Sequence, residues 1–381
     1  MAPSRIAAFL VLWLIASPAV GFGQTAAPDV WPTAVDRYLS GGRDQAASLL
    51  LASPASELVA SSRRAFAAWT PAPAGDADAR RQLLRRLQAS ALLPLEVLVA
   101  VTGRTLNPAY EAALEDAGRE AWRRLDAFDD EDDGVAAAQV RRFRTWWRLG
   151  HVQHLIASGR FRDVPREAMA VHPPADDPEA VATLALLRGL ALETRARLAD
   201  EAPGANVAVS MRRLSTPSRL GPMLLAMDDA GKQYRRALEV SPDDREATLR
   251  LGRVALERDR LDEAERVLTP LLPGACRDAI CGLAHLFMGE VHEARSQPDR
   301  AASAYARASA VPALRHTALV AMMQASLRRG NAGGAFDLTR QFGTPAALAA
   351  RQPADAWTIY AGGQLVERTR ILATLGETVV P

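Results

Sequence analysis

The sequence contains little cysteine, little lysine and few aromatic residues. It has two cysteines, Cys276 and Cys281, and a single lysine, Lys232, and aromatic residues make up 6% of the chain. A zinc site built from two cysteine pairs is therefore excluded, and CRDAIC is not the CxxCH motif that attaches haem. The 46 basic and 44 acidic residues leave a net charge of +2. This near balance gives no indication of nucleic-acid binding.

Motifs that carry catalysis or bind nucleotides are also missing. The chain has no GxSxG, no HExxH, no Walker loop and no GxGxxG following a strand. Each of these motifs places a nucleophile, metal ligand or phosphate-binding backbone in a fixed geometry. We therefore expect a protein that is not an enzyme and that carries no cofactor.

Long apolar runs are confined to the N-terminus. MAPSR is followed by IAAFLVLWLIASPAV and then by small residues, which is the pattern of a secretory signal peptide. The run is too short for a confident membrane span. We expect a signal peptide over 1–23, cleaved after Ala19, Gly23 or Ala27, and a mature chain without a membrane span. The short leader and the arginine- and alanine-rich composition favour a bacterial protein that is periplasmic or secreted.

The rest of the chain has the composition and periodicity of helices. Alanine, leucine, arginine and glutamate dominate, and apolar residues recur at i, i+3 and i+4. Breaks rich in glycine, proline and aspartate separate segments of roughly 12–20 residues. They include 40–44, 129–134, 172–178, 216–222 and 241–244. This spacing predicts an all-α chain of helical hairpins.

One hairpin carries a repeat pattern with small and large residues at fixed offsets. Ala230, Tyr234 and Ala237 lie on one predicted helix, and Gly252 lies on the next. Ala264 follows Ala230 by 34 residues. This pattern resembles the tetratricopeptide repeat. Matching residues recur in other units: Trp146, Leu149, Gly150, Gly189, Gly289, Ala301, Tyr305, Ala308, Gly330 and Ala335.

The resemblance implies a right-handed α-solenoid of helical hairpins with a less regular N-terminal helical segment. We expect the irregular segment over 30–134 and the repeat array over 135–345, with an insertion at 201–222. A stacked array leaves an apolar end face that something must cover. Residues 346–381 are therefore expected to form a capping segment.

The same resemblance implies a concave groove that binds segments of partner proteins. With Trp146 packed inside its own hairpin, Trp147 and the two histidines after it should be partly exposed in this groove. The residues expected to line it are Arg144, Trp147, His151, His154, Arg253, Glu257, Glu290, Glu293, Gln324 and Arg328.

Three local features have alternative interpretations. His151 and His154 share a helix face and could line the groove, pack structurally or, with carboxylates from a neighbouring repeat, hold a catalytic metal. The acidic turn at 129–133 resembles the start of a calcium loop, but Val140 stands where the bidentate acid is needed. Cys276 and Cys281 can form a disulfide if Cys276 precedes the helix start, or remain as two buried thiols.

These expectations together describe an exported scaffold or assembly factor of the periplasm or cell envelope. Its partner would be a protein or peptide rather than a nucleic acid. The alternatives are a metal-dependent hydrolase that uses His151 and His154, and a purely structural envelope component.

Overall fold

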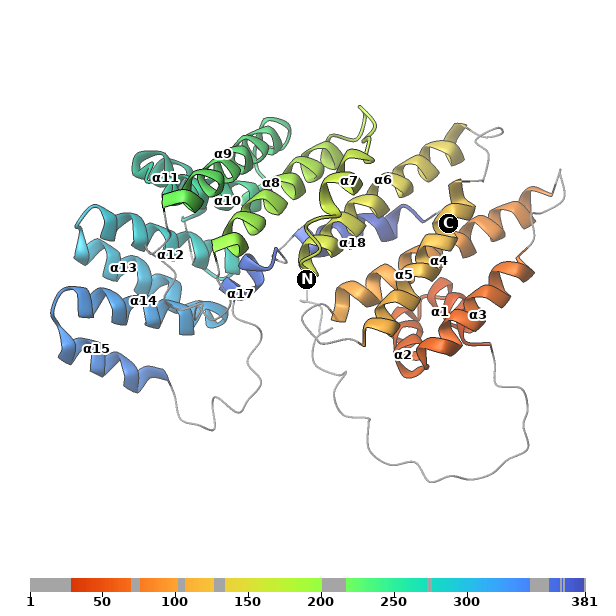
Figure 1. The fold of residues 1–381 in the computed structure, drawn as a ribbon, viewed down its shortest axis with the longest axis horizontal. Helices are drawn as coiled ribbons and strands as arrows, with labels where there is room; N and C mark the ends of the chain where they lie inside the picture. Colours follow the sequence, from red (N-terminus) through yellow and green to blue (C-terminus); the bar gives the residue numbers. More distant parts are fainter. Residues whose placement is uncertain are drawn as a thin grey trace, which may run out of the picture.

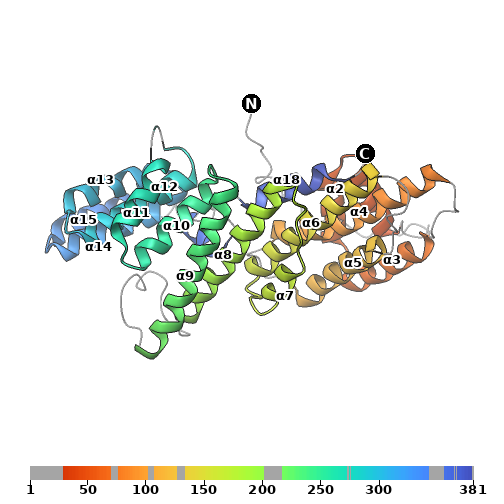
Figure 2. The ribbon, with the colours of Figure 1, turned by 90° about the horizontal axis from the view of Figure 1, so that it is seen from above.

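The computed structural model shows an all-α protein. It describes residues 29–69, 76–101, 107–126, 134–200, 217–272, 274, 276–342, 356–363, 365 and 367–379, and no β-strand occurs among them. The helices follow one another in a long row, with the N-terminal helices at one end and α15 at the other (Figures 1 and 2). The expected all-α array of stacked helices is confirmed.

The N-terminal half is built from longer and less regular helices. They are α1 (Val30–Leu39), α2 (Arg43–Ala52), α3 (Ala55–Ala68), α4 (Ala77–Val101), α5 (Pro108–Asp126), α6 (Gly134–Ala157) and α7 (Val164–Met169). Trp31, Leu114 and Phe143 are completely buried in the core of this half. One hydrophobic cluster includes residues from both sides of the predicted boundary at 134, so the irregular segment and the start of the array share a core.

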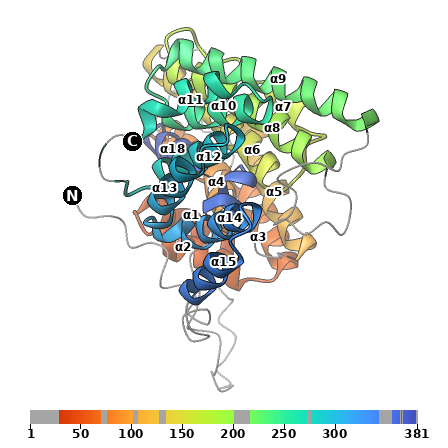
Figure 3. The ribbon, with the colours of Figure 1, turned by 90° about the vertical axis from the view of Figure 1, so that its left-hand side faces the viewer.

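The second half consists of paired helices. They are α8 (Pro178–Asp200), α9 (Pro217–Val240), α10 (Arg245–Glu257), α11 (Leu261–Leu268), α12 (Ala279–Ala294), α13 (Pro298–Ser309), α14 (Arg315–Arg328) and α15 (Ala332–Thr339). Short 3₁₀ turns occur at η1 (Thr269–Leu271), η2 (Pro312–Leu314) and η3 (Arg340–Phe342). Viewed along the row, successive hairpins turn from α9 at the top to α15 at the bottom (Figure 3).

Glycines on the first helix of each pair allow the second helix to come close. A Cβ atom on Gly189 would lie 2.5 Å from the Tyr234 ring, and one on Gly289 would lie 2.2 Å from the Tyr305 ring. Distances this short do not occur between real side chains, so only glycine permits this packing. In both α8–α9 and α12–α13, therefore, a glycine on the first helix lies against a tyrosine ring on the second.

The chain does not break over 216–222 as predicted. Helix α9 begins at Pro217 and continues through this stretch. Proline is well tolerated in the first turn of a helix, where its missing N–H would have no partner. The predicted leader over 1–23, the acidic turn at 129–133 and residues 201–216 of the predicted insertion lie outside the described residues.

The C-terminal segment does not cap the end of the array. Helix α17 (Ala356–Ala361) lies against α12, and α18 (Glu367–Glu377) lies against α6 and α4 (Figures 1 and 2). Tyr360, Ile371 and Leu375 are at most 1% exposed. The segment therefore runs back along the row toward its N-terminal half, because its apolar residues are buried against α12 and η2 and then against α6 and α4.

No helix among the described residues is both long and apolar enough to cross a membrane.

Candidate functional site

The first helices of successive hairpins form one side of the second half, which we call the inner face. It is defined by α8, α10, α12 and α14. Helix α17 lies on this face: Tyr360 Oη donates to Glu193 Oε1 of α8 at 2.7 Å. From α10, Arg250 donates to the backbone oxygen of Tyr360 at 3.3 Å, and its guanidinium lies 4.3 Å from the centre of the Tyr360 ring. The inner face thus holds a segment of the chain's own C-terminal region.

Glu193 and Arg250 are at the centre of a buried polar network. Glu193 also accepts a hydrogen bond from Tyr234 Oη, and its Oε2 lies 3.4 Å from Arg250 Nη1. Arg250 Nε donates to Glu246 Oε1 at 2.9 Å. Both charged side chains are 1% exposed. Removing one partner of a buried ion pair typically costs about 3–5 kcal/mol, since the remaining charge is left without compensation.

The charges in this network stabilise one another. Burial disfavours the Arg250 cation, but Glu246 and Glu193 outweigh that effect and raise the pKa of Arg250 well above its usual value. Burial and the neighbouring Glu193 carboxylate raise the pKa of Tyr234. The arginine therefore remains charged, and the tyrosine remains a neutral hydrogen-bond donor.

A second arginine contacts the aromatic residues of α17. The guanidinium of Arg253 lies 4.8 Å from the centre of the Phe287 ring and 5.3 Å from that of Trp357. Phe287 meets Trp357 edge-on at 6.0 Å, and Trp357 stacks with Tyr360 at 5.6 Å. Cations over aromatic faces are attracted by the ring quadrupole, most strongly when they are shielded from water. The two aromatic residues of α17 are therefore held between arginines and a phenylalanine.

Ion pairs extend along the inner face from α10 to α14. Arg253 pairs with Glu257 and with Glu290 of α12, each at 2.7 Å. Glu293 of α12 pairs with Arg328 of α14 at 2.6 Å. The structure thus brings these predicted groove residues together on one face, where Gln324 of α14 also lies.

Arg253, which is predicted to line the groove, lies on this face but is buried. Its side chain is 6% exposed, because Trp357 and Phe287 lie against it. Exposure increases away from α17: the side chain of Glu290 is 18% exposed, and that of Arg328 is 57% exposed. The accessible part of the inner face is therefore at α14.

Trp147 and His154 are also not on an open groove. Trp147 is 7% exposed, stacks on Trp122 of α5 at 4.7 Å and donates through Nε1 to the backbone oxygen of Ala91 in α4 at 2.8 Å. His154 is 3% exposed. The prediction fails because α4 and α5 pack on this side of α6. Trp146 is buried as predicted.

Arg144 and His151 lie on the same side of α6 and are half-buried, with side chains 20% and 16% exposed. Arg144 donates to the backbone oxygen of Leu125 at 2.5 Å, at the end of α5, where a cation offsets the negative helix terminus. The His151 ring stacks on Trp147 at 5.3 Å, and its Nδ1 lies 3.9 Å from Glu167. Burial lowers the pKa of His151 to about 4, although the Glu167 carboxylate opposes this shift.

His154 lies beside two carboxylates that the metal alternative would need. Its Nε2 is 3.7 Å from Glu111 Oε1 and 3.6 Å from Glu115 Oε1. Glu115 is already engaged, since Arg160 donates to its Oε1 and Arg119 donates to its Oε2. Although its burial acts in the opposite direction, contacts with His154 and the two arginines lower the pKa of Glu115 to about 2. The arginines already neutralise Glu115, so the contacts describe a partly exposed ion-pair cluster beside a buried histidine.

The repeat pattern of the second half has an independent match. A tetratricopeptide repeat family model matches residues 226–275, which contain most of α9 together with α10 and α11. Residues 226–275 therefore carry a tetratricopeptide repeat.

Two further comparisons add little to this assignment. Among solved structures, the crystal structure of the yeast Tom70 is similar to this chain at a TM-score of 0.20 and 12% identity. The match covers 91% of this chain and 95% of that chain. A comparison with curated proteins gives no match.

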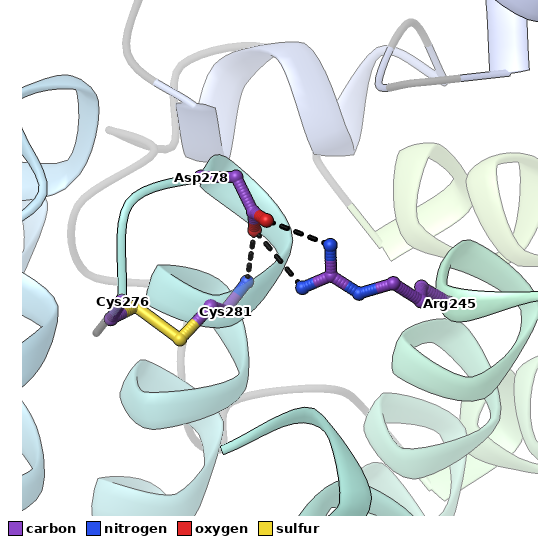
Figure 4. The surroundings of a disulfide bond; sticks show 4 residues. All are labelled: Arg245, Cys276, Asp278 and Cys281. Carbon is purple, nitrogen blue, oxygen red and sulfur yellow. Dashed lines mark hydrogen bonds and ion pairs between the residues drawn. A yellow bond between two sulfur atoms is a disulfide. The ribbon is translucent and has the colours of Figure 1, made fainter. Parts of the chain in front are cut away.

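A disulfide fixes the loop between two hairpins of the second half. Cys276 is joined to Cys281, with the two Cα atoms 5.5 Å apart. Cys276 precedes α12, which begins at Ala279. Asp278 accepts from the backbone N–H of Cys281 at 2.8 Å and pairs with Arg245 of α10 at 2.7 Å (Figure 4). The loop therefore holds the start of α12 against α10, on which the alignment of the inner face depends.

Sequence reasoning missed the part of the site supplied by the C-terminal segment. Trp357 and Tyr360 are three residues apart, a spacing that places both rings on one side of a short helix. Glu246 and Arg250, four residues apart, were a second signal, since this is the spacing of a helical ion pair. An aromatic pair on a short, mainly apolar segment could have indicated a docking helix.

Proposed function

We propose that this protein is a non-enzymatic scaffold or assembly factor whose inner face binds a segment of a partner protein. One observation carries the proposal: the inner face already holds a peptide segment, α17, through side chains from three successive hairpins. Binding of a helix by anchors at i and i+3 in a groove is a common mode of peptide recognition. The charged and exposed surface of α14 continues from this segment and offers further contact area.

We place this function in a bacterial periplasm or cell envelope. The N-terminal pattern of a basic start, an apolar run and small residues supports export. The Cys276–Cys281 disulfide also supports it, because such bonds persist in oxidising compartments. N-terminal sequencing of the native protein tests export: a chain that retains Met1 would contradict it.

Site-specific photo-crosslinking in the native cell tests partner binding. A photoreactive residue at Leu327, which is 56% exposed on α14, should form a crosslink to a protein partner. The matched control is Leu225, which is 66% exposed on α9, the second helix of its hairpin. Equal crosslinking at both positions, or none at Leu327, would contradict partner binding at the inner face.

A further inference from the structure

The receptor for α17 is compact and chemically specific. We define it as Glu193, Arg250, Arg253 and Phe287, which come from α8, α10 and α12. Glu193 accepts from a phenol, Arg250 contacts both a ring face and a backbone oxygen, and Arg253 and Phe287 contact an indole. Trp, Tyr and Arg are the residues most often responsible for binding energy at protein interfaces. This set of contacts recognises an aromatic pair rather than a general apolar surface.

The contacts of α17 with the receptor depend on few atoms. The helix has six residues, and such a short helix is not stable alone in water. Thr358, between the two aromatic anchors, is exposed. Trp357 and Tyr360 therefore provide the ring and phenol contacts with the receptor, while Ala356 and Ile359 pack against the hydrophobic core beside it.

The path of the chain after α17 depends on one glycine. Gly363 has φ +70°, a conformation that disfavours other residues and β-branched ones most. A Cβ atom there would lie 2.5 Å from Leu190 and 2.9 Å from Ile156. Gln153 donates to the backbone oxygen of Gly363. A side chain at 363 would therefore unseat the segment without altering the receptor or the aromatic pair.

From this geometry we infer the kind of partner. The receptor binds a partner segment that presents Trp and Tyr three residues apart on one helical turn, and α17 occupies the receptor as an internal copy of that segment. The inference rests on the proposed function and names its partner class. A segment of the same chain competes with a partner for the receptor at a high effective concentration, which can reach the millimolar range when the tether is short. The partner therefore binds the intact chain more weakly than it binds a chain whose receptor is vacant.

A labelled peptide of residues 356–363, AWTIYAGG, tests the inference on the full-length chain. Fluorescence anisotropy should show at least about tenfold tighter binding to the Gly363→Val chain than to the unaltered chain. Gly330→Val is the matched control, because Gly330 has φ +75° and a Cβ atom there would meet nothing within 4 Å. This control should bind the peptide no better than the unaltered chain does.

Two more variants keep the test independent of the effect of valine on folding. Trp357→Ala combined with Tyr360→Ala vacates the receptor without touching Gly363, and this chain should also bind the peptide. Adding Arg253→Ala to either vacated chain should reduce binding by about tenfold or more. Circular dichroism establishes that each variant retains its helices.

Each outcome separates the inference from the proposed function. Peptide binding to neither vacated chain, or binding unaffected by Arg253→Ala, would overturn the inference even if crosslinking at Leu327 finds a partner. Specific peptide binding without any crosslinked partner would support the receptor and contradict the proposed function alone. If the Gly363→Val chain forms a dimer and the peptide dissociates it, the receptor binds α17 of a second copy of this chain. That result would overturn the inference that the receptor binds a different partner protein.

Discussion

The close contact between Gly289 and Tyr305 gives a direct test of the repeat packing. Gly289→Ala adds a Cβ atom 2.2 Å from the Tyr305 ring, which is 1% exposed and cannot move into solvent. The control is Gly231→Ala on α9, where the new Cβ atom would meet Val254 at 3.4 Å, an ordinary contact. Both substitutions replace a helical glycine by the residue with the highest helix propensity.

The two substitutions should change stability in opposite directions. Replacing Gly by Ala within a helix contributes about 0.8–1 kcal/mol, and this is the expected gain for Gly231→Ala. At Gly289 the overpacking costs about 1–3 kcal/mol. Displacing Tyr305 also disturbs its 2.9 Å hydrogen bond to Glu293, which is worth about 1 kcal/mol. The net expectation is a loss of about 1–3 kcal/mol at Gly289.

Urea unfolding followed by circular dichroism measures both changes. A double-mutant cycle with Tyr305→Ala adds a sharper criterion, because removing the ring should relieve most of the cost of Gly289→Ala. If Gly289→Ala is as stable as Gly231→Ala, or if the cycle shows no coupling, the packing of α12 on α13 is not as described.

Three further predictions concern the core, the buried histidine and the C-terminal segment. Trp147→Ala should destabilise the protein by about 3–5 kcal/mol in thermal unfolding, because the indole is buried; a loss below about 0.5 kcal/mol would restore its predicted exposure. The pKa of His151 is lowered to about 4, so its contribution to stability is present above pH 6.5 and is lost as the pH falls from 6.5 to 4, by up to about 3 kcal/mol. His151→Phe should flatten urea stability over this range, and an unchanged slope would contradict the assignment. Tyr360→Phe removes a buried hydrogen bond to Glu193 and should cost about 1–3 kcal/mol in urea unfolding, whereas no change would show that α17 is not seated there.

The hairpins could be predicted because their packing depends on short-range patterns. Gly289 and Tyr305 lie 16 residues apart within one unit, and their counterparts recur in neighbouring units. Local helix periodicity and this small-to-large pairing are both visible in the sequence. The break predicted at 216–222 failed because Pro217 was treated as a helix breaker, although a proline also fits the first turn of a helix.

The positions of Trp147 and His154 could not be predicted by the same means. The repeat register assigns them to the inner side of α6, but it does not reveal that α4 and α5 cover that side. Trp122, which stacks on Trp147, comes from a region where the repeat pattern is degenerate. Exposure is determined by the neighbouring helix, and a register fixes only the direction in which a side chain points.

The exposure of the inner-face charges follows from the place of α17 along the row. Arg250 is buried beneath Tyr360, the side chain of Glu290 is 18% exposed one hairpin further on, and that of Arg328 is 57% exposed at α14. Arg250 and Arg328 are both arginines, so the difference between them follows from what covers each side chain rather than from the residue type. If a partner binds the inner face as proposed, it meets the exposed charges of α14 at little cost in desolvation, because they are already in water. The proposal then requires α17 to leave before contacts form nearer α10, so binding there would be coupled to release of the C-terminal segment.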